Sequence, residues 1–122
     1  MITGGNATIY VTDLDRAVEF YNETLGLELV DRFENEWAAV RTPGGFLIGL
    51  HPARPDHPQP GAAGGITVGL FVDQALEDVH EHYFRRGVKF QGPIVNDEVV
   101  RLAWFADPDG NQLYLCETKY KY

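Results

Sequence analysis

Short runs of alternating hydrophobic and polar residues dominate this chain, and two stretches with helical spacing interrupt them. Residues 6–12 alternate and are rich in β-branched and aromatic side chains, which predicts a strand. The apolar residues that follow recur at spacings of three and four, which predicts an amphipathic helix over residues 14–25. Asp13 is the expected N-cap of this helix, and Gly26 is expected to end it.

Three further strands are predicted after this helix, over residues 27–33, 37–41 and 46–51. A turn around Asn35 separates the first two, and Gly44 and Gly45 form the turn before the third. The first half of the chain therefore has the order β-α-β-β-β.

The same order returns in the second half of the chain. A strand is predicted over 66–72, a helix capped by Asp73 and ended by Gly87, and then strands over 88–94, 99–106 and 111–117. Gly26 and Gly87 are 61 residues apart, and the turn prolines Pro43 and Pro108 are 65 apart. These near-constant offsets indicate an internal duplication.

The segment between the two halves is rich in proline and glycine, so it cannot form a helix or an inner strand. We therefore expect one α+β domain over residues 1–122. It consists of two tandem βαβββ modules, over 5–51 and 65–118, joined by a linker or lid over 52–64.

The composition of the chain limits the classes of partner that the protein can be expected to bind. The chain has 122 residues, 44% of them hydrophobic, and a net charge of −8, which argues against a nucleic-acid partner and would suit a cationic ligand. No apolar run reaches the length of a membrane span, and no signal-peptide pattern opens the sequence. Cys116 is the only cysteine, so no intrachain disulfide can form. These features favour the cytoplasm and no membrane partner.

Three motifs carry a resemblance to a known family. They are the Val-Thr-Asp-Leu-Asp-Arg-Ala-Val-Glu-Phe-Tyr run over 11–21, the Leu-Gly-Leu of 25–27, and the Asp-Pro-Asp-Gly-Asn of 107–111. Together they resemble the vicinal oxygen chelate superfamily, which includes glyoxalase I, bleomycin resistance proteins, fosfomycin resistance enzymes and extradiol dioxygenases. The resemblance implies two modules whose mixed sheets curl into a cup, a homodimer, and sites in or between the cups.

The resemblance also assigns the positions that hold a divalent metal in the catalytic members. These positions lie on the first and last strand of each module and usually hold His, Glu or Gln. Here they hold Asn6, Gly49, Thr67 and Tyr114, which do not make a divalent-metal site. We therefore expect no metal and no cofactor, favour binding over catalysis, and assign no catalytic residue.

Strand alternation identifies the side chains that share the inner face with those four positions. This face carries both tryptophans and further aromatic and polar residues, the composition of a small-molecule pocket. The predicted ligand-binding residues are Asn6, Thr8, Tyr10, Trp37, Arg41, Gly49, His51, Thr67, Phe71, Trp104, Gln112 and Tyr114. Gly49, together with Gly69, is expected to leave space for a planar ligand that stacks on Trp104, with Trp37 closing the site. The alternative is that these aromatic rings fill the cup or a dimer interface.

These observations support three hypotheses. The leading one is a metal-free binding protein that sequesters an aromatic or cationic small molecule such as an antibiotic. The second is an enzyme of the same superfamily, a lyase, isomerase or dioxygenase, with an unusually held metal or with His51, Tyr114 or Arg41 as acid–base groups. The third is a module that serves only as an interaction domain.

Overall fold

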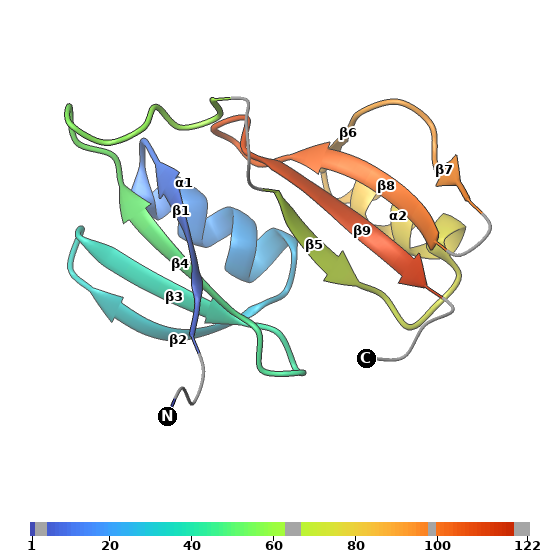
Figure 1. The fold of residues 1–122 in the computed structure, drawn as a ribbon, viewed down its shortest axis with the longest axis horizontal. Coiled ribbons are helices and arrows are strands. Elements are labelled where there is room, and N and C mark those ends of the chain that lie inside the picture. Colours follow the sequence, from blue (N-terminus) through green and yellow to red (C-terminus); the bar gives the residue numbers. More distant parts are fainter. Residues whose placement is uncertain (2–4, 63–66, 98–99, 119–122) are drawn as a thin grey trace. The chain divides into compact units, whose positions relative to one another are not determined.

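The computed structural model describes residues 1, 5–62, 67–97 and 100–118. The chain divides into two compact units, Met1–Ala62 and Ala63–Tyr122 (Figure 1). Each unit has one helical segment after its first strand and is built around a mixed sheet, which confirms the predicted α+β class. The predicted first residue of module two, residue 65, lies outside the described residues.

The first unit has a four-stranded sheet with the order β1-β4-β3-β2. Its elements are β1 (Ala7–Val11), α1 (Leu14–Val18), a π-helical turn η1 (Glu19–Thr24), β2 (Glu28–Phe33), β3 (Trp37–Arg41) and β4 (Leu47–Pro52). Strands β1 and β4 are parallel, whereas β4–β3 and β3–β2 are antiparallel. The helical segment covers one face of this sheet (Figure 1).

The predicted helix over 14–25 is only partly α-helical. Asp13 is its N-cap as predicted, because its carboxylate accepts the Arg16 backbone N–H at 3.1 Å. After Val18 the helix widens, and the Leu25 N–H donates to the Phe20 carbonyl at 2.9 Å, five residues back. Gly26 ends the segment with φ +81°, as predicted. The wide turn leaves both Tyr21 and Leu25 buried in the core.

The helix-facing side of this sheet forms the core of the first unit. Ile9 and Val11 of β1 are buried, as their alternation predicts, and Ile48 and Leu50 of β4 lie beside them. Thr8 and Tyr10 therefore lie on the opposite face of the sheet. The candidate site lies on this face, called the open face below.

The second unit repeats the arrangement with the order β5-β9-β8-β6. Its elements are β5 (Val68–Phe71), α2 (Leu76–Arg85), β6 (Lys89–Phe90), β7 (Val95–Asn96), β8 (Val100–Ala106) and β9 (Gln112–Thr118). Strands β5 and β9 are parallel, and both β6 and β7 pair antiparallel with β8. The predicted strand over 88–94 is therefore wrong in its extent. Gly92, with φ +71°, and Pro93 interrupt it between β6 and β7.

The N-terminus of α2 also differs from the prediction. The helix starts at Leu76 with Ala75 as N-cap, so Asp73 is not the cap. The Glu117 carboxylate of β9 instead accepts the Leu76 N–H at 3.1 Å. The Arg101 guanidinium of β8 donates to Glu117 at 3.0 Å and also pairs with Glu77 in the first turn of the helix. A side chain 41 residues away in sequence thus satisfies a backbone donor that a local cap usually satisfies.

This ion-pair network predicts an acid-sensitive second unit. The hydrogen bond from Arg101 lowers the pKa of Glu77 from 4.5 to about 2. A carboxyl group with a lowered folded-state pKa stabilises the fold above its unfolded pKa, and this contribution is lost as the pH falls. We expect stability to decline between pH 4.5 and about 2, and Glu77→Gln to flatten part of that decline. Urea unfolding at several pH values measures the free energy of unfolding. The same dependence of this free energy on pH in the parent and in Glu77→Gln would contradict the prediction.

The Asp-Pro-Asp-Gly-Asn motif forms the turn between β8 and β9, as predicted. Asp107 is buried, and its carboxylate accepts the backbone N–H groups of Asp109 and Asn111 at 2.9 and 2.8 Å. Gly110 has φ +84°, a conformation that suits glycine. The motif therefore holds the hairpin together. Within the described part of the chain, no helix is long and apolar enough to cross a membrane.

Candidate functional site: an aromatic row on the first unit

Aromatic side chains lie in a row across the open face of the first sheet, one from each strand. Tyr10 of β1 is paired with His51 of β4, and Phe33 of β2 is paired with Trp37 of β3. The ring centroids of Tyr10 and His51 are 5.8 Å apart, and those of Trp37 and His51 are 6.5 Å apart. Phe33, at the outer edge, is 59% exposed. The row therefore crosses the whole sheet and presents ring surface.

A fifth ring, His57, joins this row from the segment predicted as a linker. Its centroid lies 4.7 Å from that of Tyr10 at an interplanar angle of 35°, and 5.2 Å from that of His51. We call Phe33, Trp37, His51, Tyr10 and His57 the aromatic row.

Backbone hydrogen bonds determine which nitrogen carries the proton in each histidine of the row. His51 Nδ1 lies 2.7 Å from the Pro52 carbonyl oxygen. A carbonyl only accepts, so His51 Nδ1–H is the donor. His57 Nδ1 instead accepts the Arg54 backbone N–H at 3.0 Å, so this nitrogen is unprotonated. The two rings therefore present Nε2 atoms of opposite character, an acceptor on His51 and a donor on neutral His57.

Gly49 lies beneath the indole of Trp37. A Cβ atom built on Gly49 would come within 3.0 Å of three indole carbons, Cη2, Cζ3 and Cζ2. In the second unit, a Cβ on Gly69 would overlap the ring of Tyr114 in the same way. The expectation that these two glycines leave open space is wrong, because an aromatic ring from a neighbouring strand fills the space over each of them.

The surface around the β2 end of the row is acidic. Asp31 is paired with Ala39, and Glu34 and Glu36 lie in the turn between β2 and β3. Arg41 forms an ion pair with Glu28 at 3.1 Å, and Arg32 forms one with Asp15 at 2.5 Å, so both nearby cations are compensated. Among the described residues, no ion pair involves Asp31, Glu34 or Glu36. The row is therefore flanked by a surplus of negative charge.

The remaining predicted residues of the first unit lie at the edge of this site. Asn6 is exposed just before β1, and Thr8 is exposed on β1 opposite Gly49. The charge of Arg41 is shared with Glu28, so this side chain is not an uncompensated cation in the site.

The other predicted residues form a separate group on the second unit. Trp104 and Tyr114 are paired across β8 and β9 with ring centroids 4.8 Å apart. Phe71 is 65% exposed and is paired with the buried Cys116, and burial raises the pKa of this thiol. Gln112 is paired with Ala106, and Thr67 is exposed before β5. The prediction that a ligand stacks on Trp104 stays a prediction.

The four positions that hold a metal in catalytic relatives do not fit one here. Gly49 offers no side chain and is covered by the indole, and the Tyr114 ring lies against Gly69. Asn6 and Thr67 are exposed and supply neutral oxygens. In the part of the chain that the structure describes, no three His, Cys, Asp or Glu side chains are grouped so that they could hold a metal.

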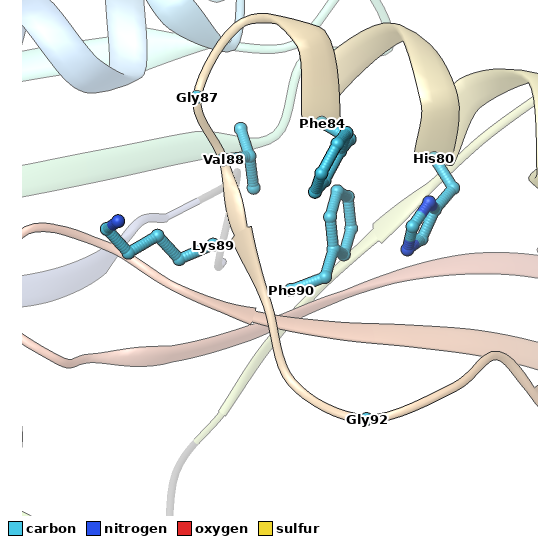
Figure 2. A pocket seen from close by; sticks show the side chains of 7 residues that line it. All are labelled: His80, Phe84, Gly87, Val88, Lys89, Phe90 and Gly92. Atoms are coloured by element: carbon cyan, nitrogen blue, oxygen red, sulfur yellow. The ribbon is translucent and has the colours of Figure 1, made fainter.

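An open groove of about 520 Å³ lies on the second unit, between α2 and β6 (Figure 2). His80 of the helix stacks on Phe90 of the strand with centroids 3.9 Å apart, and Phe84 lines the groove beside them. These rings already pack on one another, and the groove contains none of the predicted site residues.

Sequence reasoning missed Phe33 and His57. Phe33 could have been found, because it and Trp37 flank Asn35 at equal distances, which places them opposite each other across a tight hairpin. His57 left no such signal, since nothing in a proline-rich segment tells which side chain turns back onto the sheet.

Comparison with known proteins gives matches over nearly the whole chain. The family model described as Glyoxalase/Bleomycin resistance protein/Dioxygenase superfamily matches residues 5–115. None of the curated proteins compared with this chain matches it.

Solved structures match as well. A superfamily member from Sphaerobacter thermophilus is 30% identical with a TM-score of 0.79, covering 96% of this chain and 98% of its own. TnmS3, an antibiotic-binding protein from Streptomyces, is 29% identical with a TM-score of 0.75, and the coverage is 98% and 99%. A protein from Nocardioides, 19% identical with a TM-score of 0.75 and coverage of 100% and 92%, shares the fold.

Proposed function

We propose that this chain, which belongs to the Glyoxalase/Bleomycin resistance protein/Dioxygenase superfamily, binds and sequesters a planar aromatic cation without a metal. An antibiotic with a cationic aromatic group is the kind of ligand intended. The binding surface is the aromatic row of the first unit.

The observation that carries this proposal is the aromatic row with its acidic border. Stacked aromatic rings stabilise a complex by about 0.5–1.5 kcal/mol beyond the area that they bury. A cation over the face of an aromatic ring gains further electrostatic attraction. Asp31, Glu34 and Glu36 favour the approach of a cation, and the net charge of −8 acts in the same direction.

Two further observations support binding rather than metal catalysis. TnmS3, which matches over 98% of this chain, is an antibiotic-binding protein. The donor set at the four metal positions is poor, and the Gly49 position is covered by Trp37. No arrangement among the described residues favours a particular lyase, isomerase or dioxygenase step.

Fluorescence titration with 10-methylacridinium, a planar aromatic ion of fixed charge, tests the proposal. Trp104→Phe leaves Trp37 as the sole tryptophan, and Trp37→Phe leaves Trp104. We expect saturable quenching of Trp37 emission, with a much smaller change at Trp104. No quenching in either variant, or stoichiometric Zn²⁺, Ni²⁺, Mn²⁺ or Fe²⁺ in protein purified without chelator, would contradict the proposal.

We also propose that the protein is a homodimer. The β2 strand is an exposed sheet edge with Leu29 and Phe33 among its exposed residues, and such edges in natural proteins are protected or paired. Sedimentation at micromolar concentration is expected to give twice the 13.7 kDa chain mass. A single species of 13.7 kDa across that range would contradict it.

A further inference from the structure

His57 lies in the first unit, beyond the end of β4, in the segment that the sequence predicts as a linker. It is brought to the sheet by a short turn in which the His57 N–H donates to the Arg54 carbonyl at 2.9 Å. The Ala53 N–H donates to the Val11 carbonyl at 2.7 Å, which fixes the start of the same segment along β1. The segment is thus held on β1 by a backbone hydrogen bond at Ala53 and by a ring contact with Tyr10 at His57.

The position of His57 changes what a ligand meets at the β1 end of the row. The imidazole lies over the ring of Tyr10, and Tyr10 is half-buried with the edge of His51 beside it. A planar molecule that stacks on Trp37 and extends toward β1 therefore reaches His57 before it reaches Tyr10.

The turn also depends on the protonation state of His57. Its Nδ1 accepts the Arg54 N–H, and only an unprotonated nitrogen can do so. Protonation converts Nδ1 into a donor facing another donor, so the turn loses the hydrogen bond that orients the ring.

The charged and titratable groups around His57 do not offset this effect. Tyr10 of β1 and His51 of β4 face the imidazole, and Arg54 and Asp56 belong to its own turn. Arg54 and Asp56 carry opposite charges, and His51 is a second imidazole, which can only gain positive charge when it is protonated. Protonation therefore adds positive charge at this end of the row.

We propose that His57 is a ligand-contacting residue, and that it holds a planar aromatic cation only while its imidazole is neutral. The inference rests on the proposed function and adds a residue and a pH dependence to it. Bound cation is retained above neutral pH, and protonation releases it chiefly by charge repulsion, with a smaller contribution from the lost Arg54–His57 side-chain hydrogen bond.

Two variants separate the parts played by the ring and by the turn. His57→Phe keeps an aromatic ring but cannot titrate or accept the Arg54 N–H. His57→Asn offers an amide oxygen to that N–H but has no ring. Affinity for 10-methylacridinium is measured for each protein at about pH 8 and about pH 5.5, either side of the ordinary histidine range.

We expect the parent protein to bind at least about tenfold more weakly at the lower pH. His57→Phe is expected to bind within about twofold of the parent at the higher pH and to lose most of the pH dependence, with the remainder due to His51. His57→Asn is expected to bind at least about threefold more weakly than the parent at the higher pH. A parent and a His57→Phe variant with the same pH profile would overturn the inference.

Failure of the inference and failure of the proposed function give different results. If the parent binds the probe at both pH values with equal affinity, the proposed function stands and the role of His57 is wrong. If the parent does not bind at the higher pH, the proposed function itself is wrong, and the His57 inference falls with it. Circular dichroism at both pH values confirms that each protein is folded when it is measured.

Discussion

Replacing Trp37 by alanine is expected to weaken the binding of 10-methylacridinium by about 10- to 30-fold. This range corresponds to a loss of about 1.4–2 kcal/mol of binding free energy. The indole is the largest ring of the aromatic row and lies between Phe33 and His51. Its removal eliminates a stacking contact of about 0.5–1.5 kcal/mol together with the apolar area that the ligand buries on it. Titration of folded protein by isothermal calorimetry measures the loss.

Trp104→Ala is the matched control for this experiment. It also removes a tryptophan side chain, but from β8 of the second unit, where Trp104 is paired with Tyr114 of β9 and packs on its ring. We expect it to change the affinity less than twofold. A larger loss for Trp104→Ala than for Trp37→Ala would move the ligand to the second unit, as the sequence alone had suggested.

Alternation along the strands was sufficient to predict the α+β class and the buried and open faces of β1. Ile9 and Val11 are buried while Tyr10 joins the open face, because successive side chains of a strand point to opposite sides. The repeat offsets likewise predicted that the second half of the chain repeats the first, and in both units the first and last strands are indeed paired with each other. Such periodic signals depend only on local geometry, and for that reason the sequence reveals them.

Features that depend on contacts between distant residues were not predictable in this way. The cap of α2 comes from Glu117, and no pattern around Asp73 indicates that a carboxylate from β9 replaces it. The turn that places His57 on Tyr10 is equally remote from the β1 sequence. The break between β6 and β7 did have a signal, Gly92 followed by Pro93, which outweighs the β-propensity of the residues on either side.

The position of the Trp37 indole is the clearest feature that strand alternation could not predict. Periodicity places Trp37 and Gly49 on the same face, but it does not say whether the indole lies over the glycine or away from it. If Gly49 were open, the site would contain a cavity. If Gly49 is covered, the site instead contains an indole ring supported by the strand. The glycine is covered in the structure, since the six-membered ring of the indole occupies the space that a Cβ atom on Gly49 would need.

This arrangement predicts that Gly49→Ala destabilises the first unit by about 1–3 kcal/mol, the usual range for an added group in a filled space. The new methyl group would overlap three indole carbons, so Trp37 must leave its position. The free energy of unfolding in urea, followed by the emission of Trp37 in the Trp104→Phe background, measures both the loss and the displaced ring. Gly44→Ala is the control, because its nearest neighbour is Thr42 Oγ1 at 3.9 Å.

A double-mutant cycle isolates the contact between the two side chains. In a Trp37→Ala background the indole is absent, so Gly49→Ala is expected to cost less than about 0.5 kcal/mol or to stabilise the strand, where glycine is less favourable than alanine. The coupling energy between the two positions should therefore be about 1–3 kcal/mol. An equal cost of Gly49→Ala in both backgrounds would show that the indole does not lie on Gly49. In that case Trp37 would be mobile on the open face, and the aromatic row would lack the rigid central ring on which the proposed ligand stacks.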